Sequence, residues 1–119
     1  MTVLDAHVWW AWVVVVANGV AGAWALAAHR LEPLRHRSLW WFTTAAQLSI
    51  FVQVVLGVVM VGAQGYEVDE FHMFYGFISI IAVGIVYSYR QQVWPHRFLL
   101  YGGGGLFLMG LSIRAMLLA

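Results

Sequence analysis

Four long apolar stretches dominate the chain and constrain its fold more than any other feature. They cover about residues 7–28, 39–62, 71–89 and 98–118, and only short polar segments separate them. A helix needs about 20 mostly apolar residues to cross the hydrocarbon core of a bilayer. Short connections make consecutive helices run antiparallel. The sequence therefore predicts an all-α membrane protein, a single transmembrane domain over residues 1–119 with four helices in an up-down-up-down bundle.

The composition agrees with a chain that lies almost wholly in lipid. Hydrophobic residues make up 63% of the 119 residues and charged residues only 9%, whereas a soluble domain carries about 25% charged residues. Cysteine and lysine are both absent. This excludes disulfides, thiolate metal sites, iron–sulfur clusters and a retinal Schiff base. The net charge of +1 gives no sign of a nucleic-acid partner, so we expect the lipid bilayer to be the main partner.

Arginines divide the connections between the stretches into two kinds. The first connection holds Arg30, Arg35 and Arg37 and the third holds Arg90 and Arg97, whereas the N-terminus and the second connection hold only acids. Cytoplasmic loops carry an excess of basic residues. We therefore expect the first and third connections in the cytoplasm and both termini outside, in a multi-pass protein of a bacterial plasma membrane.

Two segments of the chain share a pattern that indicates a duplicated helical hairpin. Residues 5–12 and 70–77 both read acid, any residue, histidine, apolar, aromatic, aromatic, small, aromatic. A weaker match pairs residues 36–39 with 96–99. Aromatic-rich helix ends also resemble each other through composition alone. The shared acid and histidine are not explained by such a composition. Because internal repeats of membrane proteins often hold a site at their interface, the histidines of the repeat are candidate site residues.

His7 and His72 are the candidate cofactor ligands. Each lies near the outer end of its predicted helix, and the first and third helices of an up-down bundle are diagonal neighbours, so the two imidazoles can face each other at similar depth. Four residues after each histidine comes a small residue, Ala11 or Gly76. Residues four apart share a helix face, so this spacing leaves room for a flat macrocycle. Because imidazole is a usual axial ligand of haem iron, we predict one haem b between His7 and His72.

Arg114 is a further candidate at this end of the bundle. It lies inside the fourth apolar stretch, where a charge is costly and needs a partner. A haem propionate would provide one. An ion pair with Asp5, Glu67 or Glu70, or extension of the side chain to the outer headgroups, explains the residue equally well.

Two other functions fit the same residues. Asp5, His7, Glu70 and His72 supply two nitrogen and two carboxylate ligands, a set that suits zinc, copper or non-haem iron. Residues two apart do not share a helix face, so the acids would have to lie in non-helical caps to reach the same ion. The third function needs no cofactor: a small subunit or assembly factor of a larger membrane complex, or a homo-oligomer, with the glycine run 102–105 as a contact surface.

The remaining polar residues admit two interpretations each. Four polar side chains lie inside the apolar stretches: Asn18, Gln47, Ser49 and Gln53. They can hydrogen-bond between helices, or they can form a quinone site together with nearby aromatic residues. Three histidines on the cytoplasmic side are explained by the membrane interface or by a second haem; they are His29, His36 and His96. The sequence shows no nucleophile triad and no phosphate-binding loop, so an enzymatic role would be of the oxidoreductase, electron-transfer type.

The segment from Gln53 to Gly57, followed after a short polar loop by His72 to Gly76, resembles the haem-binding four-helix half of the haem A synthase type. It resembles cytochrome b561-like domains more loosely. The resemblance implies haem held between histidines of different helices, and it carries over His72 alone as a ligand. The catalytic glutamate motif of haem A synthase has no match here, so the resemblance implies haem binding rather than haem synthesis. The function we expect is that of a small b-type cytochrome, which exchanges electrons with the quinone pool or another redox partner.

Overall fold

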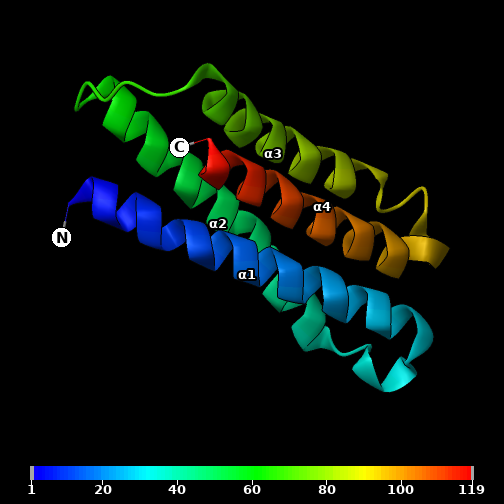
Figure 1. Ribbon diagram of the computed structural model, residues 1–119. Helices are drawn as coiled ribbons and strands as arrows, with labels where there is room; N and C mark the ends of the chain where they lie inside the picture. Colours follow the sequence, from blue (N-terminus) through cyan, green and yellow to red (C-terminus); the bar gives the residue numbers. More distant parts are fainter. Residues whose placement is uncertain (1, 119) are drawn as a thin grey trace.

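The computed structural model describes residues 2–118, and its regular structure over that range is entirely helical (Figure 1). Four long helices are present: α1 (Val3–Arg30), α2 (Arg37–Gly62), α3 (Glu70–Tyr89) and α4 (Arg97–Leu117). Two short 3-10 turns, η1 (Glu32–Leu34) and η2 (Trp94–His96), precede α2 and α4. By length and composition, α1, α2, α3 and η2 together with α4 can each cross a membrane. The prediction of an all-α chain with four membrane-spanning helices is confirmed at this level.

The helix ends follow from local capping groups. α1 begins at Val3, earlier than the predicted residue 7, because the Thr2 side chain accepts from the Asp5 backbone N–H while the Asp5 carboxylate accepts from the Thr2 backbone N–H. Such a capping box satisfies two N–H groups that a helix start otherwise leaves free. α3 begins after Asp69, whose side chain accepts from the Phe71 N–H at 2.8 Å. Gly65, with φ of 71°, turns the chain between α2 and α3 in a conformation that glycine adopts without strain.

Apolar side chains cover the outside of the bundle, whereas several polar side chains are buried inside it. Trp9 and Trp41 are 70% and 71% exposed, and many other large hydrophobic residues on all four helices are exposed as well. Asn18, by contrast, is 1% exposed. Its Nδ2 donates to the carbonyls of Val14 and Ala46, at 2.9 and 3.1 Å, and so links α1 to α2. This distribution suits a protein whose outer surface contacts lipid tails rather than water.

The closest helix contact in the bundle is between α1 and α4, and glycines make it possible. A Cβ atom at Gly105 would lie 2.7 Å from the Gly22 Cα, and one at Gly22 would lie 2.7 Å from the Leu106 backbone nitrogen. A Cβ atom at Gly102 would lie 2.5 Å from the Leu26 side chain of α1, and one at Gly104 would lie 2.8 Å from the Val86 side chain of α3, whereas one at Gly103 would meet no atom within 4 Å. Of the glycine run 102–105, predicted as a contact surface, Gly102 and Gly105 thus pack against α1, and Gly104 packs against α3.

The other helices are arranged around this pair. α2 packs mainly against α1, and α3 packs mainly against α4, whereas α2 and α3 contact each other little. α1 and α3 therefore lie diagonally across the bundle. In Figure 1, the N-terminal end of α1, the connection from α2 to α3 and the C-terminal end of α4 lie towards the same end of the molecule.

The glycine contact predicts a position-specific loss of stability. Gly105→Ala places a methyl group against the α1 backbone, and overpacking of this kind costs about 1–3 kcal/mol. Gly103→Ala is the matched control, because a Cβ there meets no atom within 4 Å. We expect thermal unfolding in detergent at a lower temperature for Gly105→Ala and an unchanged or higher temperature for Gly103→Ala. Equal unfolding temperatures for the two variants would contradict the close α1–α4 contact.

Candidate functional site

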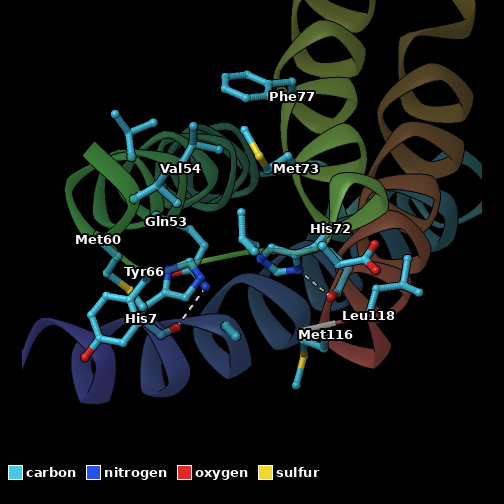
Figure 2. Close-up of a pocket in the computed structure, with 18 of the residues that line it drawn as sticks. His7, Gln53, Val54, Met60, Tyr66, His72, Met73, Phe77, Met116 and Leu118 are labelled. Carbon is cyan, nitrogen blue, oxygen red and sulfur yellow. Dashed lines mark hydrogen bonds between the residues drawn. The ribbon is translucent and has the colours of Figure 1, made fainter. Parts of the chain in front are cut away.

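The structure brings together the two histidines that the repeated pattern singled out. The ring centroids of His7 and His72 lie 6.1 Å apart, with their planes at 75° to each other. His7 comes from the second turn of α1, and His72 from the first turn of α3. Figure 2 shows both side chains extending into the same space between the helices. Two imidazoles separated by 65 positions in the sequence thus meet in one site.

The backbone around His7 is held by α2. Gln53 Nε2 donates to the His7 carbonyl at 2.8 Å, which ties the start of α1 to the middle of α2. Gly57, one turn further along α2, lies beside the ring, since a Cβ there would be 3.4 Å from His7 Cε1. A larger residue at position 57 would press against the imidazole, so Gln53 and Gly57 together determine where this ring lies.

The tautomer of His72 follows from its hydrogen bond to α4. His72 Nδ1 lies 2.7 Å from the Ala115 carbonyl oxygen, and because a carbonyl only accepts, Nδ1 carries the proton. In the neutral ring, Nε2 is then free to accept a proton or bind a metal ion. Metal-ligating histidines commonly donate their other ring N–H to a carbonyl or carboxylate, which fixes the orientation of the ring. The contact with the Ala115 carbonyl thus fixes the orientation of the His72 ring.

Two polar atoms at the site are buried and have no hydrogen-bond partner among residues 2–118. They are Nδ1 of His7 and Oε1 of Gln53. Most buried polar groups in proteins are hydrogen-bonded, and one that is not requires an explanation, such as an ion, a water or a ligand. His7 and Gln53 both line the cavity described next, so a molecule bound in it would lie beside the residues that carry these atoms.

A cavity of about 850 Å³ surrounds the two histidines. Such a volume lies within the usual range of ligand pockets, about 300–1,000 Å³. Ala11 and Gly76 both line it, and a Cβ at Gly76 would meet no atom within 4 Å, so the space beside that helix turn is open. All four long helices and the connection between α2 and α3 contribute to the lining, which is mostly apolar and includes Val14, Ile50, Val54, Met60, Tyr66, Met73, Phe77 and Met116.

The separation of the rings leaves open whether both could bind one metal ion. Two imidazole nitrogens on opposite sides of an ion, each about 2 Å from it, lie about 4 Å apart, which places the ring centroids roughly 6 Å apart. A centroid separation of 6.1 Å with planes at 75° is also that of an edge-to-face contact between two rings. The open space beside Gly76 and the small side chain of Ala11 are the features that would admit a flat ring system rather than a bare ion.

Arg114 and the acids of the repeat are not part of this site. Arg114 is exposed and does not line the cavity, although Ser112 and Ala115 on the same helix do. Its predicted contact with a haem propionate therefore has no support from its position. Asp5 is engaged in the capping box of α1, and Glu70 is exposed at the start of α3. Within residues 2–118, no three His, Cys, Asp or Glu side chains are placed to hold a metal ion, so the four-ligand alternative lacks geometric support.

The other polar residues of the spans and the remaining histidines have separate places. Asn18 and Gln53 bond between α1 and α2, as their interpretation as interhelical hydrogen-bonding residues predicts. Ser49 takes part through its carbonyl, which accepts from Trp10 Nε1 at 2.7 Å. Gln47 lines a second, smaller cavity. His36 caps α2 by accepting from the Ser38 N–H, while His29 and His96 lie in the last turn of α1 and in η2.

Sequence reasoning did not assign two residues to the histidine contacts. Gly57, quoted only within the family resemblance, lies against His7, and its spacing of four residues from Gln53 indicates a shared helix face. Ala115 contacts His72 through its backbone carbonyl. Because every residue has such a carbonyl, no sequence pattern could have identified this one.

Comparison of the chain with models of protein families, with curated proteins and with solved structures finds no match. The resemblance to the haem A synthase type and to cytochrome b561-like domains therefore stays a prediction.

Proposed function

We propose that this chain is a small membrane-bound b-type cytochrome that holds one haem between His7 and His72. The observation that carries the proposal is that these two imidazoles, with ring centroids 6.1 Å apart, line one mostly apolar cavity. The proposal includes an up-down-up-down bundle built from a duplicated hairpin, with both termini on the outer side of a bacterial plasma membrane. The distribution of arginines between the connections supports this orientation.

Each histidine has a distinct role in the proposed site. His72 is the better prepared ligand, since its Nδ1–H is held by the Ala115 carbonyl and its Nε2 is free. His7 is placed by the bond from Gln53 to its carbonyl and by the absence of a side chain at Gly57. A bound haem would supply one-electron chemistry at its iron, and the residues of this chain would hold it, exclude water through the apolar lining and set its depth in the membrane.

Removal of either histidine tests the ligand assignment. The chain purified in detergent is expected to show a Soret band and, after reduction with dithionite, sharp α and β bands. His7→Ala and His72→Ala are expected to lose most of this absorbance, because each removes a side chain that would bind the haem iron. His96→Ala is the matched control, because His96 is exposed, lies outside the cavity and makes no capping hydrogen bond; it is expected to leave the absorbance unchanged unless His96 binds a second haem.

The other outcomes of this experiment favour a different function or contradict the proposed ligands. A colourless protein with stoichiometric zinc or copper would favour the metal-binding alternative. A colourless and metal-free protein would favour the third function, that of a cofactor-free subunit of a larger complex. A Soret band that survives both histidine substitutions would contradict the proposed ligands even if haem is bound.

A second variant tests the space for the macrocycle without removing a ligand. Gly76→Leu fills the open region beside His72, so we expect at least a tenfold fall in haem affinity, measured by titration of the apoprotein with haemin. Gly84→Leu is the control on the same helix, because a Cβ there also meets no atom within 4 Å, but Gly84 is exposed and does not line the cavity. Equal affinities in these two variants would show that haem does not occupy this cavity.

A further inference from the structure

A second cavity lies near the opposite end of the bundle from the two histidines. Its volume is about 390 Å³, and α2, α3, α4 and the η2 segment line it. Thr43 and Gln53 lie on the same helix, about 15 Å apart along its axis. The two cavities therefore occupy different depths of the same bundle. Both include residues of α2 and α3, the two neighbouring helices that contact each other least.

Aromatic rings form much of the wall of this second cavity. Trp40, Phe51, Tyr87, Trp94 and Tyr101 all line it. Trp40 packs edge-on against Tyr101, with ring centroids 5.2 Å apart. Such a wall suits a planar aromatic ligand, because aromatic groups pair favourably in stacked and edge-to-face arrangements.

Thr43 supplies a polar group that lacks a partner. The residue is 5% exposed, and its Oγ1 has no hydrogen bond within the described part of the chain. This is unusual in the present bundle, since the hydroxyls of Ser79, Ser88 and Ser112 each donate to the carbonyl four residues earlier, and such back-bonding is the usual solution in a helix. A buried hydroxyl without a partner is costly, so a ligand oxygen that bonds to it would be stabilised.

Gln47 and Arg90 complete the polar part of the lining. Gln47 lies one turn beyond Thr43 on the same helix face, and its amide offers both a donor and an acceptor. Arg90 is the one cation of the lining; its guanidinium carbon lies 3.6 Å from the Tyr87 ring centroid, and its Nη1 donates to the Tyr87 carbonyl at 2.7 Å. The neutral donors and acceptors of Thr43 and Gln47, set among aromatic rings, favour an uncharged oxygen-bearing ring.

From these contacts we infer that the second cavity binds the head group of a lipid-soluble quinone or quinol. The ring would pack among the aromatic side chains, and its oxygens would bond to the Thr43 hydroxyl and the Gln47 amide. This inference concerns binding and goes beyond the proposed haem site. Only the further idea that the two ligands exchange electrons rests on the proposed function.

The test is a binding titration with a defined probe. A ubiquinone analogue with a ten-carbon tail is added to the chain in detergent, and quenching of tryptophan fluorescence reports occupancy. Thr43→Val and Gln47→Leu preserve side-chain size but remove the polar groups, and each is expected to weaken binding about tenfold, as the loss of one hydrogen bond predicts. Thr43→Ser retains the hydroxyl and is expected to bind as the unaltered chain does.

The controls separate this inference from the haem proposal and from misfolding. Gln91→Leu removes an exposed glutamine near the same end of the bundle that does not line the cavity, and His7→Ala alters the other site. Both are expected to bind the probe normally, whether or not haem is present. Equal affinities for Thr43→Val, Gln47→Leu and Gln91→Leu, in variants whose circular dichroism is unchanged, would overturn the inference. Displacement of the probe by phospholipid at stoichiometric amounts would also overturn it, in favour of a lipid site.

Discussion

The close contact between α1 and α4 determines the shape of the rest of the bundle. In lipid the hydrophobic effect does not drive helices together, so association depends on van der Waals packing of small residues and on interhelical hydrogen bonds. Gly22 and Gly105 bring the two backbones together, and α2 and α3 then pack on opposite partners, α2 on α1 and α3 on α4. Because α2 and α3 contact each other little, the bundle leaves space that these two helices border, and both cavities lie there.

Polar groups inside the bundle fall into two classes. One class is fully used in structure: Asn18 bonds to the Ala46 carbonyl, and Trp10 bonds to the Ser49 carbonyl, so that α1 and α2 are held in register. The other class consists of buried polar atoms without partners within residues 2–118: His7 Nδ1, Gln53 Oε1 and Thr43 Oγ1. The residues that carry the second class line one or the other cavity. An unsatisfied polar atom in a membrane-spanning bundle is costly, and a ligand in either cavity would lie beside residues that carry such atoms.

The sequence predicted the helices well because apolar length is a direct requirement of a membrane span. It also singled out His7 and His72, because an imidazole in a repeated pattern is conspicuous among apolar residues. The role of Arg114 stays a prediction: its depth along the helix can be counted from the sequence, but the face on which it lies depends on how the helix is rotated against its neighbours, and here it is exposed outside the cavity. Sequence reasoning overlooked Thr43, because a threonine in an apolar helix usually bonds to its own backbone, and only the packed structure shows that this one does not.

The measurement that tests the central claim most directly is low-temperature electron paramagnetic resonance of the oxidised, detergent-purified chain. Two imidazoles on one ferric haem give a low-spin signal, and ring planes at 75° to each other lead us to expect a strongly anisotropic one. That signal, converted to high spin in His7→Ala and in His72→Ala where haem is retained, is the predicted result. A high-spin signal in the unaltered chain, or no haem signal at all, would contradict the claim that His7 and His72 share one haem.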